Sequence, residues 1–93
     1  KIKVMKITLE LYGASRQFSK KSFLEFNLKK KSSIKELRKE IINYIDKSFK
    51  GNSSYKRIIK ASAFCSEKDI FLNENYKIIR SQKISIIPPI GGG

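Results

Sequence analysis

The chain has no histidine, and its 93 residues include a single cysteine, Cys65. One cysteine excludes a disulfide framework within the chain, and the lack of histidine excludes the usual zinc-ligand clusters. The same shortage removes catalytic triads and general bases built on histidine. We therefore expect a protein that is not an enzyme on its own and that binds no metal or cofactor itself.

Long apolar runs are also missing. None approaches the roughly 20 residues that a membrane-spanning helix needs, and no basic-then-apolar leader opens the sequence. We therefore expect a cytoplasmic protein with no membrane partner. At 40% hydrophobic residues the chain fits one domain with a modest core, too small to bury a substrate cavity of its own.

Acidic residues are scarce, with 8 Asp and Glu against 21 Lys and Arg, which gives a net charge of +13. Such a field could attract polyanions or an acidic partner, or it could reflect a bias in composition toward lysine. The cluster Lys29–Lys31 with Lys35, Arg38 and Lys39 is accordingly either a binding surface or a solvated loop and helix face. No interleaved aromatic motif accompanies it, which argues against direct nucleic-acid recognition.

What the chain does have is clear periodicity. Lys3–Leu11 and Ser22–Leu28 alternate apolar and polar residues, which predicts two half-buried strands joined as an antiparallel hairpin. From Ile34 to Phe49 the apolar residues recur every three or four positions, which predicts a helix of about four turns. Ser33 with Glu36 forms a capping box at its start, and Gly51 follows its end.

The second half of the sequence is less regular. Tyr55–Ile59 is too short to classify by period and could be a helical turn that leads into a strand predicted at Lys60–Cys65. A final β-branched strand, Lys83–Ile87, ends at Pro88-Pro89, which cannot donate to a ladder. Cys65 is expected to be a buried strand residue rather than a nucleophile. Four aromatic residues are expected to fill the core, namely Phe23, Phe26, Phe64 and Phe71.

The order of these elements predicts an α+β fold, with a mixed sheet of four to five strands packed on one main helix. The β-grasp arrangement of ubiquitin satisfies this order. Residues 1–87 would form the domain, and residues 88–93 would form a C-terminal tail.

The backbone of the tail changes within a few residues from two prolines of fixed φ to three glycines without side chains. Pro88 and Pro89 fix φ and would project the chain outward, whereas Gly91-Gly92-Gly93 has no Cβ atoms and could pass through a narrow tunnel. The six residues after Ile87 could span roughly 20 Å when extended. We therefore expect the carboxylate of Gly93 to be the reactive group, converted to an acyl-adenylate inside a partner enzyme. The alternative is a terminus without function.

The sequence also resembles the MoaD/ThiS family of ubiquitin-like sulfur carriers. The resemblance rests on a first strand and loop, ITLELYGASRQ, a capped helix, SSIKELRKEII, and the ending KISIIPPIGGG. Gly92 and Gly93 match the family's terminal di-glycine, Gly91 stands at the variable place before it, and Pro88-Pro89 stands at the Pro-Pro position. The double proline is more similar to the small subunit of molybdopterin synthase than to the thiazole-forming carrier.

The resemblance implies partners and a cycle. An adenylating enzyme of the ubiquitin-activating type, similar to MoeB or ThiF, would use ATP and magnesium to adenylate Gly93. A sulfur donor such as a cysteine desulfurase or a rhodanese would then give a thiocarboxylate. A synthase large subunit similar to MoaE would pass that sulfur to a pterin precursor in molybdenum cofactor biosynthesis. Ile87 and Ile90, on either side of the prolines, would dock on these partners.

Other outcomes remain open because this chain has Arg80-Ser81-Gln82-Lys83 where family members often carry an acidic turn. The carrier could serve thiamine synthesis or tRNA thiolation. The chain could instead be a ubiquitin-related modifier that links Gly93 to lysine amines, or a basic binding module that does not need its tail.

Overall fold

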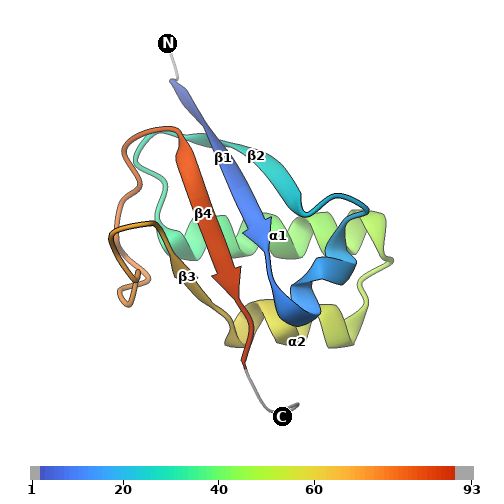
Figure 1. Ribbon diagram of the computed structural model, residues 1–93. Coiled ribbons are helices and arrows are strands. Elements are labelled where there is room, and N and C mark those ends of the chain that lie inside the picture. The colour runs from blue at the N-terminus through green and yellow to red at the C-terminus, as the bar shows by residue number, and fades with distance from the viewer. Residues whose placement is uncertain (1–2, 90–93) are drawn as a thin grey trace.

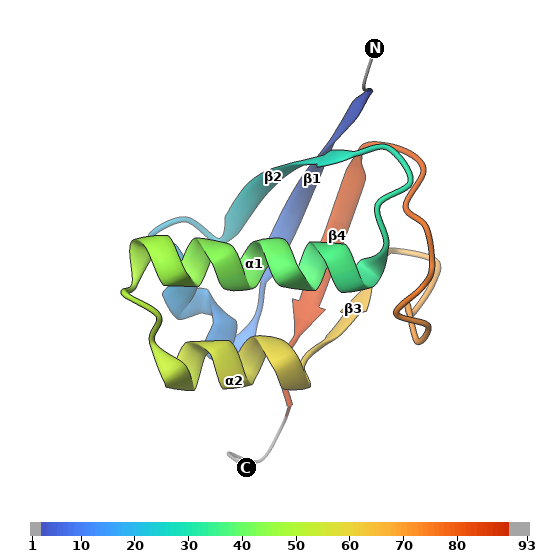
Figure 2. The same ribbon diagram turned by 180° about the vertical axis from the view of Figure 1, so that it is seen from behind.

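The computed structural model describes residues 3–89, and these form one four-stranded sheet with helices on a single face (Figures 1 and 2). The strands are β1 (Val4–Leu11), β2 (Phe23–Lys29), β3 (Ala63–Cys65) and β4 (Gln82–Ile87). The helices are the short 3-10 helix η1 (Gly13–Phe18), α1 (Ile34–Ser48) and α2 (Ser53–Ala61). None of these helices is long and apolar enough to cross a bilayer within residues 3–89.

The strand order is β2-β1-β4-β3, so the first and last strands of the chain are neighbours at the centre. β1 and β4 run parallel, with Leu9 opposite Ile84 and Leu11 opposite Ile86. The two outer strands pair antiparallel, β2 with β1 and β3 with β4. This mixed sheet confirms the predicted fold class and the predicted hairpin of the first two strands.

The core lies between the sheet and α1. Alternate residues of β1 and β4 point toward the helix, and α1 returns an apolar stripe with the spacing of successive turns. Among residues 3–89, no helix lies on the opposite face of the sheet (Figure 1). The buried residues from these three elements are Met5, Ile7, Leu9, Leu11, Ile34, Leu37, Ile41, Ile45, Ile84 and Ile86.

Both ends of α1 are capped as the sequence predicts. The Ser33 backbone N–H donates to the Glu36 carboxylate at 2.9 Å, and the Glu36 N–H donates to the Ser33 hydroxyl at 3.2 Å. The hydrogen bond from the Ser33 N–H, followed by that from its hydroxyl, holds the pKa of Glu36 below its usual value. At the other end Gly51 adopts φ +70° and donates to the Ile45 carbonyl.

The region after Gly51 differs from the prediction. Residues 53–61 are helical, so the strand predicted from Lys60 was wrong over its first residues and β3 begins at Ala63. The side chain of Asn52 accepts from the Tyr55 N–H at 3.0 Å and caps α2. The helix then places Ile59 in the core and Tyr55 against Phe18, with ring centroids 5.2 Å apart. These contacts bring together residues far apart in the sequence, so local periodicity did not indicate them.

The predicted aromatic core is confirmed for most of its members. Phe64 and Phe71 are buried, and Phe26 packs against the core cluster from β2. Phe23 was wrongly placed with them: it is half-buried on the helix-free face, and the Lys21 ammonium lies 5.6 Å from its ring centroid. Cys65 does lie in a strand, but it is half-buried rather than buried.

Arg38 is mostly buried, so it belongs neither to a basic binding surface nor to a solvated helix face, the two alternatives that the sequence left open. Its side chain is only 16% exposed. One guanidinium nitrogen donates to the backbone carbonyls of Ile59 and Ser62 at 2.7 and 2.8 Å, which closes the end of α2. The other two nitrogens bind both carboxylate oxygens of Glu74 at 3.0 and 2.7 Å. Arg38 thus joins α1, α2 and the connection before β4.

Acid is expected to weaken the fold through Glu74 and Glu36. The hydrogen bond from Arg38 is the largest of the effects that lower the pKa of Glu74 from 4.5, and the pKa of Glu36 is lowered as well. A carboxyl group whose pKa is lower in the folded state stabilises the fold at any pH above its unfolded-state pKa. That stabilisation is lost as the pH falls through the folded-state pKa. Urea midpoints should therefore fall as the pH drops below about 4.5. Glu74→Gln should remove part of this dependence, and an unchanged slope in that variant would contradict the assignment.

Candidate functional site at the exit of the last strand

β4 carries the chain from the core to the surface in its last two residues. Ile86 is fully buried and pairs with both Leu11 and Phe64. Ile87 comes next, pairs with Ala63, and is 40% exposed. The pairing with β1 ends at Ile86 and that with β3 at Ile87, so no strand within residues 3–89 pairs with the chain beyond Ile87. The prolines that follow have no N–H to offer, and at this position none is needed.

The first proline still touches the domain. Pro88 is half-buried and lies against η1, so close that a Cβ on Gly13 would come within 3.7 Å of its Cγ. Pro89 is exposed. The chain therefore leaves the domain between these two residues, close to the start of η1 at the lower edge in Figure 1. The predicted site residues Ile90, Gly91, Gly92 and Gly93 lie outside the described residues.

Gly13→Ala is expected to cost about 1 kcal/mol of stability. Gly13 adopts φ +56°, where a side chain is strained, while the added Cβ would meet Pro88 only at ordinary van der Waals distance. The loss should therefore come from the backbone and not from displacement of Pro88. Urea unfolding measures it, and Ala14→Gly in the same turn is the matched control. A loss above about 3 kcal/mol would show that Pro88 packing dominates.

One carboxylate pairs with several side chains on the surface beside the point where the chain leaves β4. On the helix-free face, Glu10 of β1 lies 3.5 Å from the Lys83 ammonium and accepts from the Ser85 hydroxyl at 3.4 Å and the Tyr12 hydroxyl at 3.3 Å. Tyr12 is itself 47% exposed and precedes η1. Together with Ile87 these side chains make a mixed apolar and polar surface next to the departing chain. Sequence reasoning missed Glu10 and Tyr12, whose only signal was the alternation of β1.

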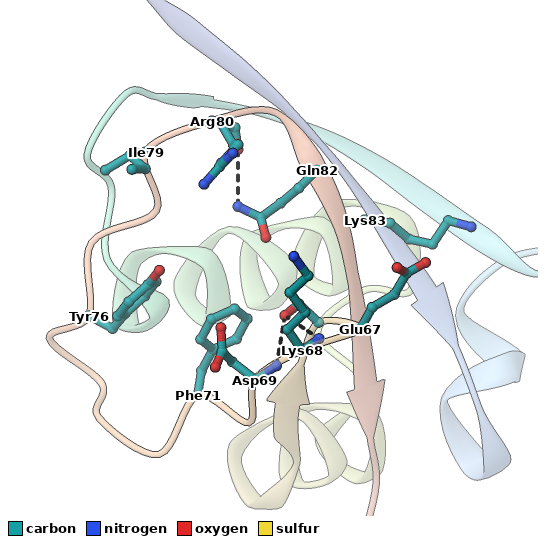
Figure 3. Close-up of a pocket in the computed structure, with 10 residues that line it drawn as sticks. Glu67, Lys68, Asp69, Phe71, Tyr76, Ile79, Arg80, Gln82 and Lys83 are labelled. Carbon is teal, nitrogen blue, oxygen red and sulfur yellow. Dashed lines mark hydrogen bonds between the residues drawn. The ribbon is translucent and has the colours of Figure 1, made fainter.

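A second feature is an open hollow of about 400 Å³ near the start of β4 (Figure 3). Its wall includes the stacked rings of Phe71 and Tyr76, whose centroids are 4.9 Å apart. Charged side chains of both signs surround it, and Lys68, Asp69 and Arg80 among them are exposed. Exposed charges stay solvated, whereas the acid and base groups that catalysis uses are commonly desolvated.

The predicted basic cluster is divided between the surface and a mostly buried position. Lys29–Lys31, Lys35 and Lys39 are exposed, whereas Arg38 is turned inward. Within residues 3–89 no group of three or more histidine, cysteine or acidic residues has the spacing to hold a metal ion.

Comparisons of sequence find no relative. A scan against models of protein families gives no match, and a search of curated protein sequences gives none either. Solved structures do match. A Pyrococcus furiosus protein, named provisionally as molybdopterin converting factor subunit 1, has a TM-score of 0.67 at 14% identity, over 92% of this chain and 99% of the other. The HVO 2177 protein of Haloferax volcanii has a TM-score of 0.67 at 12% identity, over 97% and 88%.

A ubiquitin from Caldiarchaeum subterraneum also matches, with a TM-score of 0.60 at 13% identity, over 98% of this chain and the whole of the other. The fold is the ubiquitin-like β-grasp. At these identities the likeness shows the β-grasp fold alone. In this β-grasp domain the last strand is central, and the chain leaves it beside η1.

Proposed function

We propose that this β-grasp domain is a carrier whose C-terminal carboxylate, on Gly93, is activated in the catalytic pocket of a partner enzyme. The observation that carries the proposal is the end of β4, where Ile86 is locked in the core, Ile87 is exposed and Pro89 already stands free of the domain. The four residues from Ile90 to Gly93 follow, and fully extended they could reach about 14 Å further. A tail with this composition can enter a narrow channel while the domain docks outside.

The chemistry belongs to the partner. The Gly93 carboxylate attacks the α-phosphorus of ATP and releases pyrophosphate, which gives an acyl-adenylate. A sulfur nucleophile such as hydrosulfide then attacks the acyl carbon and displaces AMP, which leaves a thiocarboxylate. ATP and magnesium are proposed to bind to the partner. Glycine has no side chain beside the acyl carbon, so the nucleophile can approach without obstruction.

The partners we propose are an adenylating enzyme of the ubiquitin-activating type, a persulfide donor of the cysteine desulfurase or rhodanese class, and a synthase large subunit. Ile87 with Tyr12 offers an apolar contact beside the exit, and such a contact is a common anchor in protein interfaces. The molybdopterin role is proposed from the ending of the sequence and from the name of the P. furiosus neighbour. Thiazole and tRNA remain the competing sulfur acceptors.

The first test is adenylation. With a candidate activating enzyme from the same organism, the protein should stimulate exchange of labelled pyrophosphate into ATP. Cys65→Ser is the matched control and should exchange at the same rate, because the proposal uses the carboxylate and not the only thiol. Exchange that depends on Cys65, or no exchange with an enzyme shown to activate another carrier, would overturn the proposal.

A second candidate function is a protein modifier that transfers Gly93 to lysine amines. The likeness to the archaeal ubiquitin supports it as well as it supports a carrier, since both share the fold and the adenylation step. The two functions differ in the step that follows adenylation. Adducts that resist reductant and contain an isopeptide bond would favour the modifier, whereas sulfur found in a small molecule or tRNA would favour the carrier.

A further inference from the structure

β2 forms one border of the sheet, and among residues 3–89 it pairs with a strand on one side only, which is β1 (Figure 1). The other border, β3, is three residues long and is partly covered, because Ile70 bridges to Cys65 and the Phe71 N–H donates to the Phe64 carbonyl at 2.9 Å. β2 has seven residues. Within residues 3–89 it is therefore the longer strand edge left without a neighbour.

The pairing with β1 determines which backbone groups point away from the sheet. The Leu11 N–H donates to the Ser22 carbonyl and the Lys30 N–H donates to the Lys3 carbonyl, each at 2.9 Å. Hydrogen-bonded pairs alternate in an antiparallel ladder, so the groups of the even-numbered residues face β1. Those of Phe23, Glu25 and Asn27 face outward. Among residues 3–89 no hydrogen bond outside the ladder uses their backbone groups.

A hollow of about 620 Å³ lies beside this edge, between β2, the end of α1 and the loop that precedes β2. Its apolar wall includes Leu24, Tyr44 and Phe49, with the two rings edge to face at a centroid distance of 6.0 Å. The Tyr44 hydroxyl donates to the carbonyl of Phe18, the last residue of η1, which ties α1 to the start of the loop. The wall is thus held by contacts within the domain and can receive side chains without being rebuilt.

The rim of the hollow is positive. Lys20 and Lys21 are exposed, and neither has a carboxylate partner among the described residues. The one carboxylate on the rim, Glu25, is paired with Lys6 at 3.2 Å. A ligand that places negative charge beside Lys20 and Lys21 would therefore meet little opposing charge.

We propose that the β2 edge binds an extended peptide segment of a partner protein as an additional strand. Outward backbone groups of Phe23, Glu25 and Asn27 hydrogen-bond to the segment, apolar side chains on one of its faces enter the hollow beside α1, and acidic residues flanking them contact Lys20 and Lys21. The site is separated from β4 by β1. It does not depend on the proposed activation of Gly93.

The test is a titration of the isotopically labelled full chain with a synthetic peptide, acetyl-Asp-Val-Ile-Thr-Val-Asp-Glu-Asp-amide, followed by NMR. Amide shifts should change at Phe23, Glu25 and Asn27 and at the two loop lysines. Glu25→Pro should weaken binding about tenfold or more, because it removes an outward N–H that the ladder does not use. Glu25→Ala also loses the pair with Lys6 but keeps the N–H, so it should bind within about twofold of the unchanged chain.

The contributions of charge and of apolar contact to peptide binding are tested separately. Lys20→Glu with Lys21→Glu should weaken binding about tenfold or more, and an acidic peptide without the apolar residues should not bind. Four results would overturn the proposal: equal binding by Glu25→Pro and Glu25→Ala, shifts confined to residues outside β2 and its loop, equal binding of the purely acidic peptide, or no shift at about 1 mM peptide. Pairing of β2 with a second copy of the chain, seen as a dimer that excludes the peptide, would overturn it as well.

Discussion

Removal of Gly92 and Gly93 is expected to slow adenylation by about 100-fold or more and to leave the urea unfolding midpoint unchanged. The shortened chain still ends in a glycine, Gly91, so the reacting group itself is preserved. The carboxylate is instead withdrawn by about 7 Å from any position that the full tail reaches. Displacements far smaller than this misalign reacting atoms inside an active site, so the lost reach is enough to slow the reaction by this factor.

The matched control for the shortened tail keeps its length. Gly91→Ser adds a small side chain two residues before the terminus and should retain most of the rate, since the carboxylate stays in place. Pyrophosphate exchange with saturating partner enzyme measures both variants. If the shortened chain is activated as fast as the full one, the proposed division between a docked domain and a reaching tail is wrong.

Arg38→Ala is expected to lower the free energy of unfolding by about 2–4 kcal/mol. The substitution removes the Arg38 donor from the Ser62 carbonyl and leaves the Ile59 carbonyl with only the Ser62 N–H at 3.3 Å, and both residues are buried. It also removes the guanidinium that lies 4.8 Å from the Phe64 ring centroid. Glu74 contributes less to the loss because its side chain is 43% exposed and water can solvate the stranded carboxylate.

Two variants separate these contributions. Glu74→Gln keeps the bonds from Arg38 to the two carbonyls and should cost only about 1 kcal/mol. Arg38→Lys keeps the charge but cannot reach all the acceptors of the planar guanidinium, so its loss should fall between the other two. Equilibrium urea unfolding measures all three. Equal losses for Glu74→Gln and Arg38→Ala would show that the ion pair, and not the capping of α2, is the main contribution.

Features encoded by neighbouring residues were predictable from the sequence. The capping box of Ser33 and Glu36 and the positive φ of Gly51 depend on contacts within one turn, and the structure confirms them. The strands β1, β2 and β4 were predictable for the same reason, because their alternation is local. The mixed sheet then followed from the order of the elements.

Features that depend on distant residues were not predictable. Arg38 resembles any other basic residue on a helix, and only the folded chain brings Ile59, Ser62 and Glu74 to it. α2 is a short helix whose Ile59 is buried by tertiary packing, so its period alone was too brief to identify. Asn52 was a local signal for its start that was overlooked.

The residues of the candidate site were predictable from the sequence, but the residues of the domain that surround it were not. The β-branched strand and the two prolines indicated where the chain leaves the sheet. The contact of Pro88 with η1 could not be inferred, and neither could the hydrogen bond and ion pair that Ser85 and Lys83 make with Glu10. In each case most of the chain separates the partners. The long edge of β2 likewise depends on a strand order that alternation does not specify.

The most direct test of the central claim is the mass of the intact protein after incubation with a ubiquitin-activating-type enzyme, ATP, magnesium and hydrosulfide. We predict that one oxygen is exchanged for sulfur and that fragmentation places the sulfur on Gly93. A mass that stays unchanged while the same enzyme modifies a known carrier, or sulfur located on Cys65, would contradict the account.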